Sequence, residues 1–394
     1  MFSDRVPSDL AANRLASTVA DLRSRRRAFI DLTESNPTRA GFDYPLDLLT
    51  RLADTRGLRY DPRPLGSLDA RRAVAADCAR QGVEVPPEHI VLTASTSDAY
   101  GLLFKLLANA GDEVLVPRPS YPLFDHLTRL DLVAIRTYDL EYHDRWSIDF
   151  DSVERALTPR TRAVLLVAPN NPTGSFVSRE ELDRLSGLCA PRDIAIIADE
   201  VFADYELEAG ATRAAGRVSC RDEVLSFALG GLSKSIGLPQ VKLGWMVVAG
   251  PHALVNAALE RLEMICDTYL SVSTPVQIAA ADLLDRGAHV RSQIQERVAT
   301  NYRSLRTAVA AVPSCRVLRS DGGWYAVMQV PSLESEDDLV VRLLTDDGVL
   351  VHPGYFFDFS RESFLIVSLL PPPSTFADGV ARVLRHFACR ADSQ

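Results

Sequence analysis

The sequence predicts an α/β fold: a large, mostly parallel sheet covered by helices on both faces, followed by a smaller α+β domain. Three observations predict it. Between residues 90 and 230, short apolar stretches alternate with helical ones, and two of the stretches, 163–168 and 194–198, contain no polar residue. Continuously apolar strands that alternate with helices are typical of a parallel sheet buried on both faces. The chain has 394 residues, which suits two domains better than one.

The N-terminal part begins with an expected amphipathic helix over residues 8–27. Its face would carry Leu10, Leu15, Val19 and Leu22 at helical spacing. Two loops rich in Pro, Asn and Gly follow at 34–38 and 60–66. A second helix is expected over residues 68–81.

The central part supplies the expected sheet. Strands are predicted at 90–92, 113–116, 132–137, 163–168, 194–198 and 224–227, with helices at 99–108, 121–130, 151–157 and 179–189 between them. Ligands of such sheets bind beyond the carboxyl ends of the strands. Polar residues gather at those ends, namely 95–98, 170–174, Asp199 and 233–234.

The C-terminal part is expected to form helices at 254–268, 276–303, 337–345 and 377–387. Strands are expected at 316–318, 324–330, 349–351 and 364–368. We therefore divide the chain into an N-terminal segment, 1–45, that packs on the small domain, a large cofactor-binding domain, 46–284, and a small C-terminal domain, 285–394.

Composition excludes several classes of function. Hydrophobic residues make up 47% of the chain and charged residues 24%, as in globular proteins. The net charge of -9 argues against nucleic acid or an anionic membrane as a main partner. The six cysteines are scattered without a CxxC pair, and no apolar stretch is long enough for a signal peptide or a membrane span. We expect a cytoplasmic protein with reduced thiols.

Lysine is scarce, and this draws attention to Lys234. The chain has only three lysines, Lys105, Lys234 and Lys242, so nearly all of its positive charge is arginine. Small and apolar residues surround Lys234 in the run GGLSKSIGL at 230–238. Such an environment lowers the pKa of an amine, which can then attack a carbonyl group. The alternative is a solvated lysine in a glycine-rich loop.

The strand-end groups match the needs of pyridoxal phosphate. This cofactor needs an amine for a Schiff base and a carboxylate near its pyridine nitrogen, so that the ring can act as an electron sink. Lys234 could supply the amine and Asp199, which ends an apolar strand, the carboxylate. Asn171 could donate its amide to the 3'-oxygen. Taken singly, Asp199 could cap a helix and Asn171 could belong to an ordinary turn.

Pyridoxal phosphate also needs a binding site for its phosphate group and an aromatic side chain that stacks on its ring. Ser95, Thr96 and Ser97 precede an expected helix, whose N-terminal N–H groups favour a phosphate. Tyr121 follows a strand and could stack on the ring. The alternatives are ordinary helix capping for residues 95–97 and a core position for Tyr121.

The order and spacing of these motifs resemble the class I/II aminotransferases, the fold-type-I pyridoxal-phosphate enzymes, over almost the whole chain. The matches are APNNPTG at 168–174, DEVF at 199–202, SK at 233–234 and KLGW at 242–245. The resemblance implies that Lys234 forms the Schiff base (the internal aldimine) and moves the catalytic proton. It also implies that Asp199 pairs with the pyridinium, Asn171 with the 3'-oxygen, and that Tyr121 stacks.

The resemblance further implies a phosphate site and a partner subunit. Ser95, Thr96, Ser97, Ser233 and Lys242 would hold the phosphate. In this family the tyrosine that matches Tyr60 reaches the phosphate of the neighbouring subunit, so the resemblance implies a homodimer.

The chain departs from the family at three positions. Phe202 stands where tyrosine is usual, which removes a hydrogen bond to the 3'-oxygen, and Lys242 stands where arginine is usual, which removes a bidentate contact. Ile366 stands where the family has the arginine that binds the substrate carboxylate. We take Arg39 as the leading substitute, with Arg118 and Arg361 behind it, and Trp324 as a further substrate contact. The alternative for Arg39 is a surface charge.

These features predict an aminotransferase that moves an amino group between an amino acid or amine and a 2-oxo acid or other carbonyl acceptor. Two alternatives stay open: a pyridoxal-phosphate lyase, decarboxylase or cyclase on the same fold, and a non-catalytic protein that binds the cofactor. A nicotinamide dehydrogenase fits poorly because no GxGxxG follows a strand. No metal site is expected.

Overall fold

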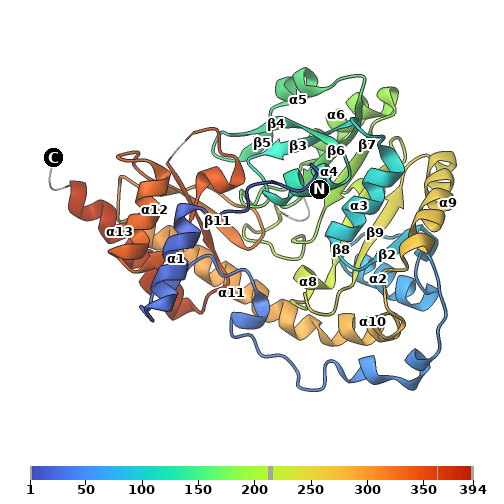
Figure 1. Cartoon of the computed structure of the whole chain (residues 1–394), viewed down its shortest axis with the longest axis horizontal. Coiled ribbons are helices and arrows are strands. Elements are labelled where there is room, and N and C mark those ends of the chain that lie inside the picture. Colours follow the sequence, from blue (N-terminus) through green and yellow to red (C-terminus); the bar gives the residue numbers. More distant parts are fainter. Residues whose placement is uncertain (1, 212–215, 362, 392–394) are drawn as a thin grey trace.

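The computed structural model describes residues 2–211, 216–361 and 363–391. Its main sheet has eight strands in the spatial order β2, β9, β8, β7, β6, β3, β4, β5 (Figure 1). In chain order these are β2 (Ile90–Thr93), β3 (Glu113–Arg118), β4 (Ala134–Tyr142), β5 (Trp146–Ile148), β6 (Thr161–Val167), β7 (Ala195–Asp199), β8 (Ser226–Gly231) and β9 (Gly244–Ala249). The predicted fold class is confirmed.

The centre of the sheet is parallel and its margins are mixed. Strands β4, β3, β6, β7 and β8 pair in parallel, whereas β9 pairs antiparallel with both β8 and β2, and β5 pairs antiparallel with β4. The carboxyl ends of β6, β7 and β8 therefore meet at one edge of the sheet. The register places Ala198 beside both Leu166 of β6 and Ala228 of β8.

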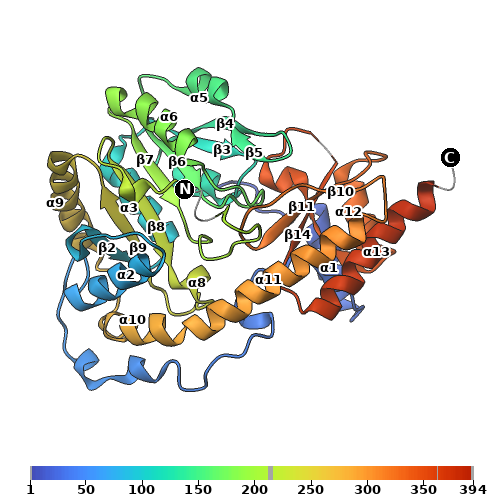
Figure 2. The same ribbon diagram turned by 180° about the vertical axis from the view of Figure 1, so that it is seen from behind.

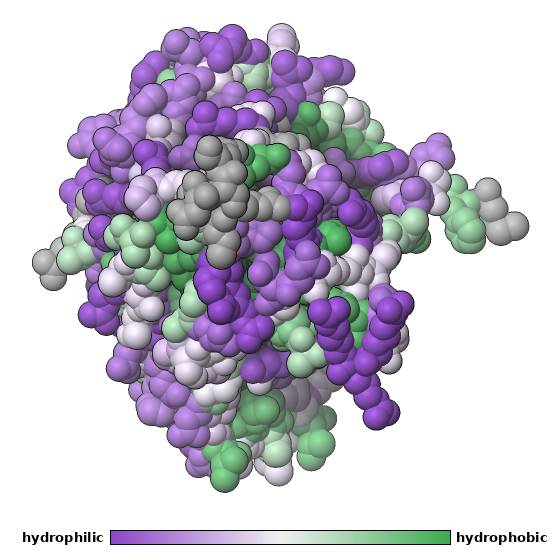
Figure 3. Space-filling view, turned by 90° about the vertical axis from the view of Figure 1, so that its left-hand side faces the viewer, coloured by the Kyte–Doolittle hydropathy of each residue, from purple (hydrophilic) through white to green (hydrophobic). Residues whose placement is uncertain are grey.

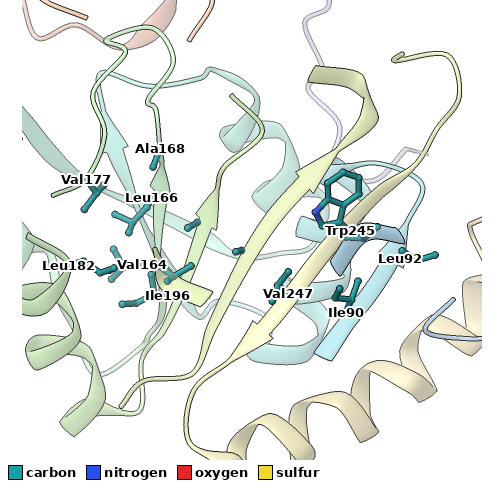
Figure 4. Close-up of a cluster of buried hydrophobic side chains, with 14 of the residues drawn as sticks. Ile90, Leu92, Val164, Leu166, Ala168, Val177, Leu182, Ile196, Trp245 and Val247 are labelled. Carbon is teal, nitrogen blue, oxygen red and sulfur yellow. The ribbon is translucent and has the colours of Figure 1, made fainter. Parts of the chain in front are cut away.

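Helices cover both faces of the sheet because successive strand residues point to opposite sides. Val164 and Leu166 belong to one buried cluster, part of which Figure 4 shows, and Ala163 and Leu165 belong to another. The first face is covered by α2 (Leu68–Arg80), α5 (Phe150–Ala156), α6 (Arg179–Cys189) and α10 (Thr274–Arg286). The second is covered by α3 (Thr96–Leu107), α4 (Leu123–Leu130) and α9 (His252–Tyr269).

A second, smaller sheet lies beside the first (Figure 2). It contains β10 (Arg316–Val317), β11 (Tyr325–Gln329), β14 (Phe364–Ser368) and β13 (His352–Pro353), all antiparallel. Around it pack α1 (Arg14–Ser24), α12 (Glu336–Thr345) and α13 (Pro373–Ala391). The long helix α11 (Ala288–Val309) runs from the large sheet to the small one.

The N-terminal segment joins this smaller unit. β1 (Ile30–Asp31) pairs in parallel with β12 (Val349–Leu350). Leu15, Leu22 and Leu32 are buried in the same hydrophobic cluster as the C-terminal helices. Contacts far apart in sequence therefore tie the start of the chain to its end.

Several predicted elements need correction. The helix expected over 8–27 is shorter, because the Asn13 side chain accepts a hydrogen bond from the N–H of Ala16 and caps α1 at Arg14. The single helix expected over 276–303 is two helices, α10 and α11, which meet at Gly287. Strands β5 and β9 were not predicted. Within the described ranges, no helix has the length and apolarity needed to cross a membrane.

Candidate active site

The predicted cofactor residues lie at the shared edge where β6, β7 and β8 end. Asp199 is the last residue of β7, Asn171 lies in the loop after β6, and Lys234 lies in α8 (Leu232–Ser235), a single turn after β8. Gly230, in β8 just before this turn, leaves room for the Trp245 side chain of β9, because a Cβ there would lie 2.4 Å from its Nε1. The sheet edge thus brings together three groups that are distant in sequence.

Lys234 is buried against two aromatic rings. Its Nζ lies 5.0 Å from the ring centre of Trp324 and 5.5 Å from that of Phe202. Burial lowers the pKa of the amine, and the charge of Asp199 opposes this effect. The amine is therefore easier to deprotonate than an exposed lysine.

The backbone on either side of Lys234 is held in place by hydrogen bonds. The Tyr205 hydroxyl donates to the carbonyl oxygens of Lys234 and Ser235, and Arg291 Nε donates to the Ser235 oxygen over 2.9 Å. Arg291 is itself buried and pairs with Asp77 at 3.0 Å. These contacts tie the lysine turn to α11.

Asp199 is partly buried at the same edge. Its Oδ1 accepts a hydrogen bond from the Val201 N–H over 3.2 Å, and its Oδ2 accepts one from the Tyr100 hydroxyl over 3.3 Å. Burial raises the pKa of Asp199 to about 6, although these hydrogen bonds and the charge of Lys234 act in the opposite direction. The carboxyl group therefore lacks the cationic partner that would fully stabilise its charge.

Tyr100 was missed in the sequence. It lies inside α3, where an aromatic residue looks like an ordinary core position, and it is 99 residues away from Asp199 along the chain. The available signal was its place in the helix whose N-terminus faces the strand ends.

Asn171 has an unused polar atom. Its side chain is buried, and Oδ1 has no hydrogen-bond partner among the described residues. The side-chain amide can turn by 180° to present either its oxygen or its NH2 group at this place, so it can serve as an acceptor or a donor. Since buried polar atoms are normally paired, this atom fits a ligand contact.

The N-terminus of α3 offers backbone donors at the same edge. Ser95 is the N-cap, and its hydroxyl accepts from the Asp98 N–H over 3.0 Å, so capping is one role of this serine. Thr96 and Ser97 begin the helix and are partly exposed. Gly244 allows β9 to approach this turn, because a Cβ there would lie 2.9 Å from the Ser95 carbonyl carbon.

The other predicted phosphate residues are less enclosed. Ser233, next to Lys234, is partly buried. Lys242 is exposed and has a φ of 61°, a conformation that non-glycine residues seldom adopt. Tyr60 is 75% exposed and lies in residues 41–67, the segment before α2 that we call the arm.

Aromatic side chains form the walls of the site. Phe202 and Trp324 meet edge to face with ring centres 5.2 Å apart. Tyr121 is 44% exposed, and burial together with the charge of Asp199 raises its pKa. Burial also raises the pKa of Tyr325 to about 12, while a hydrogen bond with Ser35 opposes that rise.

An uncharged residue, Ile366, occupies the position where the family has the arginine that binds the substrate carboxylate. Ile366 is 0% exposed on β14 and packs in an apolar cluster with Trp146 and Phe357. Arg39 ends the short 3-10 helix η1 (Pro37–Arg39) and is exposed, with no side-chain partner in the described ranges. Pro37 of the same turn lies against Gly237, since a Cβ on that glycine would be 3.3 Å from Pro37 Cβ.

Arg118 and Arg361 line a different hollow. They share it with Arg316, between the β4–β5 hairpin and the small sheet, and Arg118 pairs there with Asp139 at 2.6 Å. By contrast, the turn that carries Arg39 packs against Gly237, three residues after Lys234. Arg39 therefore stays the leading candidate for a substrate contact.

The groups at the sheet edge fit pyridoxal phosphate by their chemistry. A buried amine, a buried carboxylate, an unpaired amide atom and a helix N-terminus are the donor and acceptor types that the cofactor requires. No group of three or more His, Cys, Asp or Glu side chains in the described part of the chain could hold a metal ion.

Comparisons with known proteins agree with this chemistry. The family model for aminotransferase class I and II matches residues 27–376. The glutamate-pyruvate aminotransferase AlaA of Escherichia coli (strain K12) is 26% identical over 352 residues, which cover 86% of each chain. Human tyrosine aminotransferase is 24% identical over 412 residues, which cover 98% of this chain and 89% of that protein.

A solved structure shows the same fold. That of alanine aminotransferase from Pyrococcus furiosus has a TM-score of 0.87 at 22% identity and covers 99% of this chain and 100% of that one. The match extends over both sheets. The chain therefore belongs to the family of class I and II aminotransferases, and it is a pyridoxal-phosphate-dependent aminotransferase.

Proposed function

We propose that this aminotransferase takes its amino group from a donor with a bulky or aromatic side chain and passes it to a 2-oxo acid or another carbonyl acceptor. The aromatic enclosure of the Lys234 amine, within 5.5 Å of both Phe202 and Trp324, carries the proposal. Apolar aromatic walls favour substrates that bury apolar area. Tyrosine aminotransferase is among the relatives, whereas AlaA is a glutamate-pyruvate enzyme, so the relatives alone do not choose the donor.

Lys234 is the proposed acid and base. When bound, pyridoxal phosphate supplies an electron sink for the charge left when a proton leaves the substrate. Burial lowers the pKa of Lys234, which favours the neutral amine that can accept that proton and return it to another atom. The neighbouring rings exclude water from this transfer.

Asp199 and Asn171 are the proposed anchors of the cofactor ring. A protonated pyridine nitrogen would supply the cation that Asp199 lacks, and the free amide atom of Asn171 would supply a hydrogen bond. Tyr121 is the proposed stacking partner. Phe202 provides apolar contact only, because it has no hydroxyl.

The proposed phosphate site combines the backbone N–H groups at the start of α3 with the hydroxyls of Thr96, Ser97 and Ser233. Ser95 would contribute mainly by fixing that turn. Lys242 adds a positive charge without the two parallel hydrogen bonds of an arginine.

A homodimer would complete the site, with Tyr60 reaching the neighbouring subunit. Large apolar side chains on the arm and on α9 support this, since Leu46, Leu49, Leu58, Tyr60, Met264 and Tyr269 are all exposed. Figure 3 shows apolar side chains gathered at the lower margin of the molecule, where Figure 1 has the arm. Exposed apolar patches commonly mark interfaces. We also propose a cytoplasmic location.

Single-turnover conversion tests the proposed reaction. The loaded enzyme is mixed with one amino donor and no acceptor, then denatured, and the released cofactor is identified by chromatography. We expect pyridoxamine phosphate and one equivalent of the matching oxo acid, formed fastest with aromatic donors. Release of ammonia or carbon dioxide would instead favour lyase or decarboxylase chemistry, and faster conversion of small donors would contradict the proposed substrate class.

A further inference from the structure

Both oxygens of the Asp199 carboxylate accept hydrogen bonds. Oδ1 accepts from the Val201 N–H at 3.2 Å, and Oδ2 accepts from the Tyr100 hydroxyl at 3.3 Å. The first donor comes from the chain just beyond β7 and the second from α3. A carboxylate held from two elements cannot rotate without losing one of these bonds.

Tyr100 is itself fixed by packing. It is 2% exposed, and its ring meets that of Phe124 edge to face with centres 5.4 Å apart. The ring also lies against Phe104, one turn further along α3. In the described ranges, Asp199 is the one side chain that forms a hydrogen bond with its hydroxyl. The hydroxyl therefore points at Asp199 because the ring has no room to turn away.

The other charged and titratable groups around Asp199 have opposite effects on its ionisation. Lys234 favours the ionised carboxylate and Glu200 disfavours it, although Glu200 pairs with Arg217 at 2.7 Å. Burial and the charge of Asp199 together raise the pKa of Tyr121. Burial dominates, and it raises the pKa of Asp199 to about 6. The Tyr100 hydroxyl is thus one of few groups that stabilise the charge.

We propose that Tyr100 is a positioning residue that keeps the Asp199 carboxylate oriented and ionised for pairing with the protonated ring nitrogen of the bound cofactor. This inference rests on the proposed role of Asp199. Because Tyr100 lies in the helix whose N-terminus is the proposed phosphate site, α3 would act on both ends of the cofactor. The distance between the phosphate site and the carboxylate that binds the ring nitrogen would then be set by α3.

The test replaces Tyr100 with phenylalanine, which keeps the ring and removes only the hydroxyl. The affinity of the apoprotein for pyridoxal phosphate is measured between pH 6 and pH 9 by quenching of tryptophan fluorescence. A hydrogen bond to a charged group is strong enough that its loss should raise the pKa of Asp199, which is about 6, by about one unit, and this should weaken binding by about fivefold at pH 6 and about twofold at pH 7. Above pH 8, where Asp199 is ionised in both proteins, only the smaller loss that comes from a less well oriented carboxylate should remain. The acid limb of the turnover profile should move up by about one pH unit.

Tyr138→Phe is the matched control. Tyr138 is also buried, and its hydroxyl donates to the Leu165 carbonyl oxygen over 2.8 Å, away from Asp199. We expect this variant to lose stability without any change in the pH dependence of cofactor binding. A loss of affinity by Tyr100→Phe that is the same at every pH, or no loss at all, would overturn the proposal, because Asp199 would then be ionised without the Tyr100 hydroxyl.

Asp199→Asn separates this inference from the proposed function. If that variant binds and turns over like the wild type, the assignment of Asp199 fails and the role of Tyr100 fails with it. If Asp199→Asn is inactive while Tyr100→Phe matches the wild type at all pH values, only the role of Tyr100 is overturned.

Discussion

The Lys234 amine lies 5.0 Å from the ring centre of Trp324, a residue 90 positions further along the chain and next to β11 of the small sheet. The lysine lies in α8, directly after β8 of the large sheet. The site is therefore closed by side chains from both sheets: the large sheet contributes the charged and hydrogen-bonding groups and the Phe202 ring, and the small sheet contributes Trp324.

Replacement of Lys234 by alanine should abolish covalent attachment of the cofactor and lower turnover by at least about a thousandfold, because the variant lacks both the nucleophile and the general base. Borohydride reduction followed by peptide mass spectrometry measures the attachment. The chain has only three lysines, so the modified peptide is unambiguous. Lys105→Ala is the control: Lys105 pairs with Asp131, away from the sheet edge, and its loss should leave attachment unchanged. Labelling that persists in Lys234→Ala would refute the assignment.

Replacement of Asp199 by asparagine should stabilise the apoprotein at pH 8 while weakening cofactor binding. Burial raises the folded-state pKa of this acid from 3.8 to about 6, so its contribution to stability is present below pH 4 and is lost as the pH rises through 6. A shift of two pH units corresponds to about 3 kcal/mol. Urea unfolding of both apoproteins between pH 4 and pH 8 measures the difference. The free energy of unfolding of the asparagine variant should increase relative to that of the wild type as the pH rises. If the difference between the two free energies stays constant with pH, the pKa of Asp199 is not raised.

Replacement of Arg291 by methionine should destabilise the protein by about 3–5 kcal/mol, because it leaves buried carboxylates without their cation. Arg291 pairs with Asp77 at 3.0 Å and lies 3.5 Å from Asp204, and it also donates to the Ser235 carbonyl oxygen. Arg303→Met, on an exposed face of the same helix, is the matched control and should change stability by less than about 0.5 kcal/mol. Urea unfolding compares them. Equal effects of the two substitutions would show that the buried network is not needed.

The sequence predicted the parts of the fold that depend on local pattern. Apolar strands such as 163–168 and 194–198 were visible because both faces of a parallel strand are buried. Strand β9 was not predicted, since its limits depend on its antiparallel partners β2 and β8. The break at Gly287 was missed for a similar reason: a Cβ there would lie 2.7 Å from Ile236, a contact that exists only in the folded chain.

The residues of the site also fall into two groups: those that the local sequence predicts and those that depend on tertiary contacts. Lys234, Asp199 and Asn171 stand in short motifs that can be found without a structure. Tyr100 could not be found, because its role depends on a 3.3 Å contact between a helix and a strand end. The packing of Ile366 among apolar side chains also needed the structure, although the sequence had already placed an uncharged residue at that point.

Arg39 is the remaining test of how a substrate carboxylate is held. With Ile366 buried at the usual arginine position, Arg39 is an exposed arginine without a side-chain partner among the described residues, and its turn η1 packs beside Gly237, close to the lysine turn. Arg39→Ala should raise KM for tyrosine by roughly 10- to 100-fold, the effect of losing a hydrogen-bonded charge. Tyramine, which has the same ring and no carboxylate, should be unaffected, so the ratio of the two donors reports the contact. Arg25→Ala, which removes an exposed arginine paired with Asp21, should leave that ratio unchanged. If Arg39→Ala also leaves it unchanged, the carboxylate is held by other groups, and the arginines of the neighbouring subunit become the next to replace.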